Sequence, residues 1–292
     1  MVIDGVELRA RIFEQLLVMQ QASAGFLSRE QLKSFTIDGI RLPLIAPQQG
    51  INNPTALEAT LSVMSSPEGP YVDGSPVDGI WEYAYEGNTP GRTNAKLRRA
   101  HELGYPIVYL ERIGTGIYVP YFPVVVIGDR PADLRFDMAL DKLAALGPSE
   151  ADTGLEREYR EAIIQQRLHQ PKFRARVLAA YATQCTICHF RHAELLDAAH
   201  IISDKEEMGV AWVPNGMAMC KIHHAAYDRN FMGITPDYGI QINEELLNEV
   251  DGPMLQHGLK DMHGGKLILP KRTVDQPDRE RLAIRFAEFQ NA

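Results

Sequence analysis

The first 68 residues open with apolar side chains at helical spacing. In residues 6–17 (VELRARIFEQLL) they recur every three or four positions, which predicts an amphipathic helix. Further on, Ser28 is followed three positions later by Gln31, the pattern of a capping box, which predicts a second helix start. This region could dimerise, bind DNA or simply pack against the rest of the chain, and the sequence does not decide among these roles.

Residues 69–142 carry the alternating and β-branched runs that are typical of strands. The predicted strands cover residues 80–85, 106–110 and 117–127. The last of these contains Pro120 and Pro123, which favour a sheet edge or a bulge. Between the strands, residues 93–104 have a helical pattern that ends at Gly104. Strands around a helix predict a small barrel or an α+β domain.

Residues 147–154 (GPSEADTG) have the composition of a linker. After it, residues 156–182 are mostly helix-forming, with a break near Pro171. A chain of 292 residues exceeds the usual size of one core, so two domains are expected. We predict an α+β protein with a first domain at 1–145, a linker at 146–160 and a second domain at 161–292.

The composition narrows the class of protein. With 45% hydrophobic and 23% charged residues, the chain is typical of soluble globular proteins. No run approaches 18 apolar residues, so a transmembrane helix is not expected, and the N-terminus lacks the basic and apolar regions of a signal peptide. The prediction is a cytoplasmic protein that has no membrane partner.

The distribution of charge is more informative than its sum. The net charge of −8 argues weakly against nucleic acid, yet residues 162–193 contain five Lys or Arg residues and no Asp or Glu. This block is either a phosphate-facing patch or the solvated face of a basic helix. The candidate DNA contacts in it are Arg167, Lys172, Arg174 and Arg176.

The three cysteines form the first specific motif. Cys185 and Cys188 are a C-x-x-C pair, and Cys220 is followed at the same spacing by His223. Two such pairs about 30 residues apart are typical of a structural zinc site with Cys3His ligands. The alternative is a redox C-x-x-C with an unrelated buried Cys220.

A second set of residues lies within the same segment. His200, Asn215 and His224 follow one another in the order of the HNH motif, and residues 183–235 resemble the ββα-metal nuclease superfamily. Many members carry a histidine or an aspartate directly before the general-base histidine. Here that position is Ala199, so the resemblance implies a catalytic metal with one fewer protein ligand.

Each of these residues also has a chemical reason to be in such a site. A neutral imidazole suits His200 as the general base, and Asn215 before a glycine would tie the loop that orients it. His224 and Asp228 are four apart on a predicted helix, where they could hold Mg²⁺ or Mn²⁺. Asp197 is expected to contribute less directly.

Structural alternatives stay open for the histidines. His200 could be a hydrogen-bonded core residue, and His224 instead of His223 could be the fourth zinc ligand.

The front half resembles the SRA family, PUA-like barrels that flip 5-methylcytosine out of duplex DNA. The resemblance covers about residues 66–130 and is carried by residues 69–87, 92–97 and 104–109, although residues 87–91 replace the glycine-rich loop of the family. Base flipping needs two aromatic faces and one hydrogen-bonding group, which Tyr71, Tyr85 and Asp73 would supply. Tyr83 is a rival for the second ring, and any of these tyrosines could instead be a core residue.

An SRA domain joined to an HNH domain resembles modification-dependent restriction endonucleases. The resemblance implies a metal-dependent endodeoxyribonuclease that cuts foreign double-stranded DNA with 5-methyl- or 5-hydroxymethylcytosine, using structural Zn²⁺ and catalytic Mg²⁺ or Mn²⁺. One HNH site cuts one strand, so we expect a homodimer. The alternatives are a non-cleaving zinc-containing reader of modified DNA and an HNH nuclease of unmodified DNA. The exact modification and the sequence context cannot be read from the chain.

Overall fold

The computed structural model describes residues 5–46, 49–65, 80–87, 91–140, 170–203, 206 and 208–292. The fold is mixed α and β, and the chain divides into two compact units. The first unit consists of residues 1–20 and 25–171, and the second consists of residues 21–24 and 172–292. The expected linker at 146–160 lies outside the described residues.

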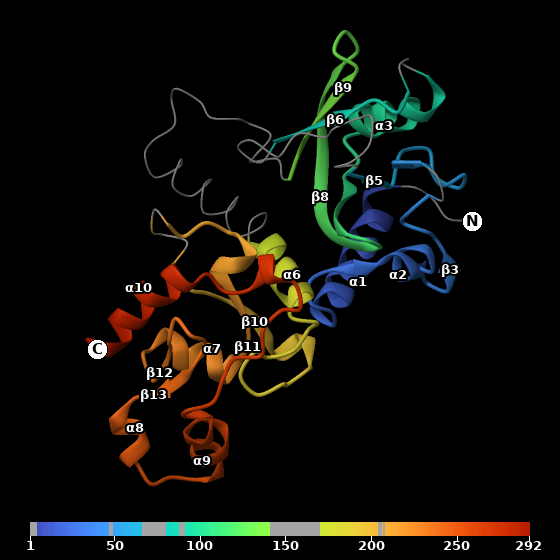
Figure 1. The fold of residues 1–292 in the computed structure, drawn as a ribbon. Helices are drawn as coiled ribbons and strands as arrows, with labels where there is room; N and C mark the ends of the chain where they lie inside the picture. Colours follow the sequence, from blue (N-terminus) through green and yellow to red (C-terminus); the bar gives the residue numbers. More distant parts are fainter. Residues whose placement is uncertain are drawn as a thin grey trace, which may run out of the picture. The chain divides into compact units, whose positions relative to one another are not determined.

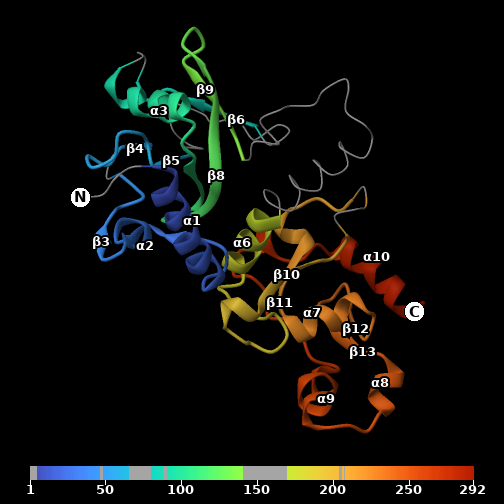
Figure 2. The same ribbon diagram turned by 180° about the vertical axis from the view of Figure 1, so that it is seen from behind.

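The first unit is built on a curled seven-stranded sheet with the order β4-β5-β7-β8-β9-β6, in which β1 also pairs with β8 (Figures 1 and 2). Its strands are β1 (Leu27–Ser28), β4 (Ile51–Asn52), β5 (Ser62–Met64), β6 (Ile80–Ala84), β7 (Ile107–Gly114), β8 (Ile117–Arg130) and β9 (Arg135–Ala139), and β2 (Thr36–Ile37) and β3 (Ile40–Arg41) form a separate hairpin. All neighbours are antiparallel except β5 and β7. The long strand β8 pairs first with β1 and β7 and then with β9, so the sheet bends along it.

At both prolines, β8 pairs with β7 on one side, and no described strand pairs with it on the other side, because β1 pairs with residues 117–118 and β9 with residues 125–130. Pro120 pairs with Leu110, and the register of β7 against β8 shifts between the pairs that flank Pro123. A bulge leaves an extra residue outside the ladder, so the missing N–H of Pro123 removes no regular hydrogen bond there. The predicted bulge and the predicted local edge are therefore both confirmed.

Helix α3 (Arg92–Leu103) packs on β8 and ends where the sequence predicted. Gly104 has φ 62°, the left-handed conformation that glycine adopts without strain at the end of a helix.

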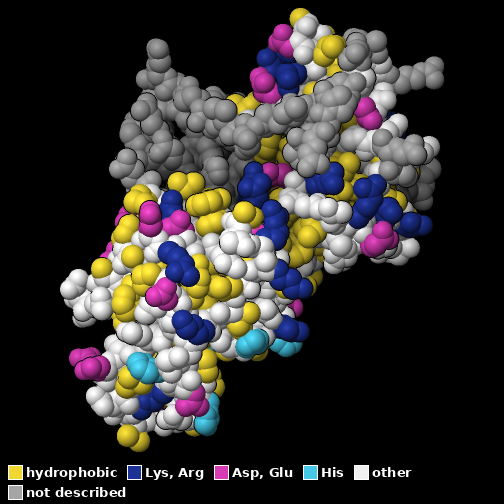
Figure 3. Space-filling view, in the orientation of Figure 1, with side chains coloured by type: hydrophobic (Ala, Val, Ile, Leu, Met, Phe, Trp, Pro, Cys, Tyr) yellow, Lys and Arg dark blue, Asp and Glu magenta, His cyan; other side chains and the backbone are white. Residues whose placement is uncertain are grey.

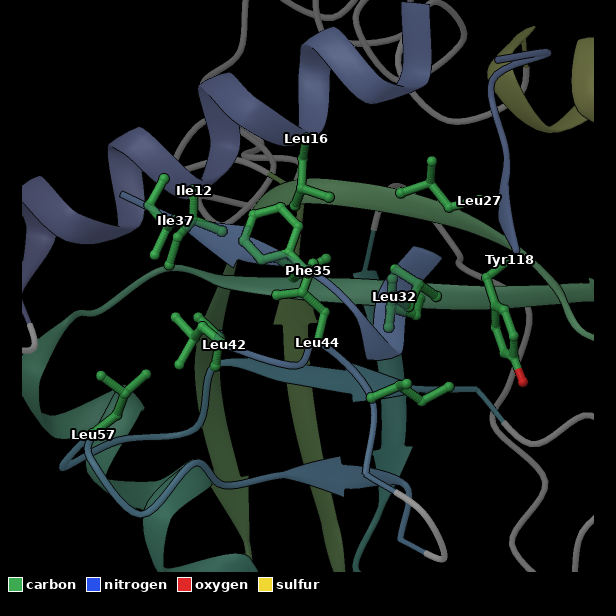
Figure 4. Packing of buried hydrophobic residues seen from close by; sticks show 14 of the residues in the cluster. Ile12, Leu16, Leu27, Leu32, Phe35, Ile37, Leu42, Leu44, Leu57 and Tyr118 are labelled. Atoms are coloured by element: carbon green, nitrogen blue, oxygen red, sulfur yellow. The ribbon is translucent and has the colours of Figure 1, made fainter. Parts of the chain in front are cut away.

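The N-terminal segment is part of the core of the first unit. Helix α1 (Val6–Gln21) confirms the predicted amphipathic helix, and α2 (Arg29–Lys33) has the predicted capping box between Ser28 and Gln31. Figure 4 shows Ile12 and Leu16 of α1 pointing towards Phe35, Leu32 and Leu44. Packing is therefore the role that the structure gives this segment.

Arg9 fixes α1 by a different kind of contact. Its side chain is fully buried, and its guanidinium donates to the carbonyl oxygens of Thr60 at 2.8 Å, Pro106 at 2.9 Å and Ala59 at 3.3 Å. The guanidinium carbon also lies 5.1 Å from the centre of the Tyr105 ring. A buried cation is tolerated when its donors are satisfied, and here backbone carbonyls satisfy them.

The second unit contains a ββα arrangement followed by smaller elements. Its helices and strands are α6 (Gln170–Ala180), β10 (Leu196–His200), β11 (Gly216–Cys220), α7 (Lys221–Asp228), β12 (Met232–Ile234), β13 (Ile240–Ile242), α8 (Glu244–Asn248), α9 (Pro253–Gly258) and α10 (Arg279–Gln290). Strands β10 and β11 form an antiparallel hairpin, and α7 starts directly after β11 and packs against both strands (Figure 1). Pro171 lies in the first turn of α6, where its missing N–H interrupts no helical bond.

The described part of the chain contains no helix with the length and apolar character needed to cross a membrane.

Candidate functional site

Four side chains converge at the junction of the hairpin and α7. The ligand atoms of Cys185, Cys188, Cys220 and His223 all lie within 4.8 Å of one another. His223 Nδ1 is 3.2 Å from the Sγ of Cys220 and 3.4 Å from the Sγ of Cys185. A tetrahedral zinc with bonds of about 2.0–2.3 Å places its ligands roughly 3.5–3.8 Å apart, so this donor set fits zinc.

A hydrogen bond to a backbone carbonyl orients the imidazole of His223. Its Nε2 donates to the carbonyl oxygen of Gly258 at 2.7 Å, so Nε2 carries the proton and Nδ1 keeps its lone pair for the metal. This arrangement gives the fourth position to His223 and not to its neighbour His224. It also includes Cys220 in the cluster, which removes the alternative of an isolated redox pair.

His200 ends strand β10, where it pairs with Gly216 of β11. Its imidazole stacks on the ring of Phe173 from α6, with 4.0 Å between the ring centres and 12° between the planes. The absence of a side chain at Gly216 makes this possible, because a Cβ there would lie 2.7 Å from Phe173 and 2.6 Å from Val177. Helix α6 therefore holds the His200 ring in one orientation.

Asn215 closes the loop between the two strands. Its side-chain oxygen accepts from the backbone N–H of Ile202 at 3.0 Å, and its amide nitrogen donates to the carbonyl oxygens of Ile202 at 3.0 Å and Val210 at 3.2 Å. Its backbone oxygen also accepts from Ile201 N at 2.9 Å. The buried amide thus ties the chain directly after His200, which is the geometry that the motif predicts for this residue.

On the side of the hairpin that α7 covers, His224 lies between two carboxylates. Its Nδ1 is 3.6 Å from Asp197 Oδ2, and its Nε2 is 3.3 Å from Asp228 Oδ2. Lys221 Nζ lies 3.3 Å from Asp197 Oδ2. The His224 imidazole, with help from Lys221, lowers the pKa of Asp197 below its ordinary value, against the opposing effect of partial burial.

The pKa of His224 moves the other way. Its contact with Asp197 raises the pKa, burial opposes this, and Asp228 adds to the rise. Asp197 therefore stays ionised over a wide pH range, which is the state that a hard divalent cation requires of an oxygen ligand.

These oxygen and nitrogen donors suit Mg²⁺ or Mn²⁺. Among the described residues, the Cys3His cluster is the one group of three or more converging donors. An ion bound by His224 would therefore have one carboxylate as its second protein ligand, and water and phosphate would supply the other ligands. Asp197 lies two residues before Ala199 on the same face of β10 and can supply the carboxylate that Ala199 lacks.

A comparison with protein families gives the same segment an identity. Residues 185–235 match the family model described as HNH endonuclease. This segment is an HNH endonuclease domain. It contains all four zinc-cluster residues, His200, Asn215, Asp197, His224 and Asp228.

Two solved structures align with large parts of the chain at low similarity. One is a modification-dependent TagI restriction endonuclease, with 15% identity, a TM-score of 0.28 and coverage of 83% of this chain and 86% of that chain. The other is the Type IV phosphorothioation-dependent restriction endonuclease ScoMcrA, with 16% identity, a TM-score of 0.24 and coverage of 65% and 55%. Similarity at this level does not extend the identification beyond the HNH domain. No curated protein matches the chain.

The basic residues before the HNH domain differ in their surroundings. Arg174, which we expected to contact phosphate, donates to the carbonyl oxygens of Ala193 at 2.9 Å and Leu196 at 2.8 Å. Burial lowers its pKa, and Asp197 opposes that change. Nη2 of its guanidinium is thus bonded within the unit, and its contact with phosphate stays a prediction. Arg176 is exposed and Lys172 is half-buried, while Arg167 lies outside the described residues.

The aromatic residues expected to bind a flipped base are only partly described. Tyr71 and Asp73 lie outside the described residues. Tyr85 is 1% exposed, its ring lies 4.6 Å from that of Phe136, and its hydroxyl bonds to Asp129. Tyr83 is also buried. The core contacts of Tyr85 leave its ring covered, so the structure argues against it as a stacking face.

Proposed function

We propose that the protein is a metal-dependent endonuclease that hydrolyses phosphodiester bonds in double-stranded DNA. The observation that carries this proposal is that Asp197, His224 and Asp228 lie close together at the hairpin whose first strand, β10, ends at His200. Phosphodiester hydrolysis needs a general base that activates water and a binding site for a divalent ion.

In this proposal His200 accepts a proton from the attacking water. Its position at the end of β10 and its stacking on Phe173 restrict the imidazole to one orientation. Asn215 fixes the backbone that follows His200, so the base does not move relative to the hairpin. Restricting a general base in this way removes orientational freedom that would otherwise raise the barrier.

His224 would hold the catalytic Mg²⁺ or Mn²⁺ together with one of its two neighbouring carboxylates, Asp197 or Asp228. When bound, such an ion neutralises charge on the phosphorane-like transition state and on the leaving oxygen. The Cys3His cluster has no such part in the reaction, because its four protein ligands leave a zinc ion no open position. It holds α7 and the hairpin together.

The test is cleavage of supercoiled plasmid with and without Mg²⁺ or Mn²⁺. His200→Ala should lower the rate by at least about a hundredfold, since a positioned base contributes roughly 10²–10⁴. His257→Ala is the matched control, because this histidine lies on the surface and bonds to Asp261. A folded His200→Ala protein that cleaves at the wild-type rate would disprove the assignment. Folded wild-type protein that never cleaves would favour the non-cleaving reader.

The proposed binding site for the divalent ion is tested separately. Asp197→Asn should raise the divalent-ion concentration needed for half-maximal cleavage, by roughly 10- to 100-fold for a lost carboxylate near the ion. Asp261→Asn removes a surface carboxylate that also pairs with a histidine, and it should leave the metal requirement unchanged. An unchanged requirement in Asp197→Asn would show that Asp197 does not serve the ion.

We further propose that the target is DNA with 5-methyl- or 5-hydroxymethylcytosine and that the protein restricts foreign DNA as a homodimer. The support is the SRA-like sequence of residues 69–87, 92–97 and 104–109. Tyr71 and Asp73 are the proposed contacts to the base, so Tyr71→Ala should cost about 1–3 kcal/mol of affinity for modified duplex. Equal affinity of the wild-type protein for matched modified and unmodified duplexes would disprove this part and leave the nuclease proposal intact.

A further inference from the structure

The turn that follows the first zinc ligands exposes an unusual set of side chains. We name His189, Phe190, Arg191 and His192 the knuckle surface; all four residues are exposed. The Phe190 and His192 rings lie 5.1 Å apart and are tilted by 46° to one another. Phe190 and His192 flank Arg191 in the sequence, so two aromatic rings and one cation belong to the same exposed turn.

The knuckle surface is held in place on both sides. On the zinc side, Cys185 N donates to Phe190 O at 2.8 Å and His189 N donates to Cys185 O at 3.1 Å, with His189 in a left-handed conformation at φ 62°. On the other side, Arg174 donates to the carbonyl oxygens of Ala193 and Leu196. The surface is therefore pre-organised, which lowers the entropy lost on binding.

The charge around this surface is opposite to that of the whole chain. Residues 170–195 contain Lys172, Arg174, Arg176 and Arg191 but a single acidic residue, Glu194, in a chain of net charge −8. Figure 3 shows Lys, Arg and His side chains gathered on the part of the second unit that Figure 1 colours yellow. Such local positive charge is complementary to a polyanion.

We propose that the knuckle surface binds the DNA that the HNH domain cuts, with Arg191 on a phosphate and the Phe190 and His192 rings against sugar or base. This inference rests on the proposed function and assigns its DNA contact to the turn, in place of the expected face of α6 that carries Arg174. Rings interleaved with a cation are a recurrent way to hold nucleic acid, because the cation pairs with phosphate and the rings stack. Arg174 then acts as a positioning residue beneath the surface.

The experiment measures binding of a fluorescent duplex by anisotropy in buffer without added divalent ions, so that no cleavage occurs. The triple variant Phe190→Ala, Arg191→Ala, His192→Ala should weaken binding at least about tenfold. It should also reduce the slope of log affinity against log salt by about one, the contribution of one phosphate contact. The double variant Phe231→Ala, Arg279→Ala removes an exposed ring and an exposed arginine elsewhere in the unit and should change neither quantity.

Metal analysis and circular dichroism show whether the triple variant keeps its zinc and its fold. A folded, zinc-loaded triple variant with wild-type affinity and salt slope would overturn the inference. So would a variant that only changes sedimentation, because the surface would then be a contact between copies of the chain. If the variant fails to fold, Arg191→Ala alone should still lower the salt slope, and an unchanged slope would overturn the inference. Cleavage is not measured here, so failure of the nuclease proposal would be seen separately.

Discussion

The two units of this protein are stabilised by different means. The first has a continuous apolar core in which α1 and α2 pack on the curled sheet. The second holds its hairpin and α7 together at a Cys3His cluster. The hairpin and α7 by themselves bury little surface, so zinc at this cluster would add to the apolar residues that the second unit buries, such as Leu178, Met219 and Leu282.

Their buried cationic and imidazole groups differ in the same way. Arg9 of the first unit donates hydrogen bonds to three backbone carbonyl oxygens of the chain itself. His223 of the second unit gives one nitrogen to a carbonyl and turns the other towards the cysteines. Within the described residues, the one cluster that could hold zinc lies in the second unit, so we expect the two units to respond differently to loss of metal.

The largest expected effect is the loss of the zinc ligand in Cys220→Ser. Structural zinc contributes about 10–16 kcal/mol in zinc-finger peptides, which exceeds the stability of most domains, so the second unit should unfold. Hydrogen exchange should show loss of protection in β10, β11 and α7. The first unit should keep its protection.

The two tryptophans allow the units to be followed separately. Trp81 is 1% exposed in the first unit, whereas Trp212 is 50% exposed in the second. In a Trp212→Phe background, the fluorescence of Trp81 reports on the first unit alone. A Trp81 transition that shifts in Cys220→Ser would contradict the expectation that the first unit keeps its stability. A second unit that folds without zinc would contradict its expected dependence on the metal.

A smaller effect, confined to the first unit, is expected for Arg9→Met. This change leaves three carbonyl oxygens without their donor, which should cost roughly 2–4 kcal/mol in the Trp81 transition. The control is Arg11→Met, because Arg11 makes an exposed ion pair with Asp38 that is worth at most about 1 kcal/mol. Similar losses in the two variants would mean that the buried contacts of Arg9 add little.

The smallest effect on stability is expected for Gly216→Ala in the second unit. The added methyl group must displace Phe173 or Val177, at about 1–3 kcal/mol for overpacking. Because Phe173 also stacks on His200, cleavage should slow by more than the stability loss explains. Gly252→Ala serves as the control, since a Cβ there meets nothing within 4 Å. Cleavage at the wild-type rate in Gly216→Ala would separate Phe173 from the positioning of His200.

The sequence predicted best what depends on near neighbours in the chain. The C-x-x-C and C-x-x-H pairs bring their ligands together through single turns, and His224 and Asp228 are adjacent on one helix face. Helix α1, the capping box at Ser28 and the end of α3 at Gly104 follow from local periodicity and caps in the same way.

What the sequence could not predict depends on pairing between distant segments. Asp197 meets His224 only because β10 and β11 pair in one register and α7 packs on one face of them. Arg174 has the same side chain as a phosphate contact, and only the position of α6 shows that it faces Ala193 and Leu196. The alternation along β10, which puts Asp197 on the same face as Ala199, was the one available signal.

The bond from His223 to Gly258 has a consequence for the design of a minimal nuclease fragment. The family match ends at residue 235, yet the carbonyl that orients the zinc ligand lies 23 residues further on. Ile268 exchanges two hydrogen bonds of 2.8 Å with Thr186, in the middle of the C-x-x-C turn, and Asp278 N donates to Pro214 O at 2.9 Å. A gene cut at the motif boundary would therefore encode the ligands without the backbone that aims them, and the smallest autonomous fragment must extend past residue 278.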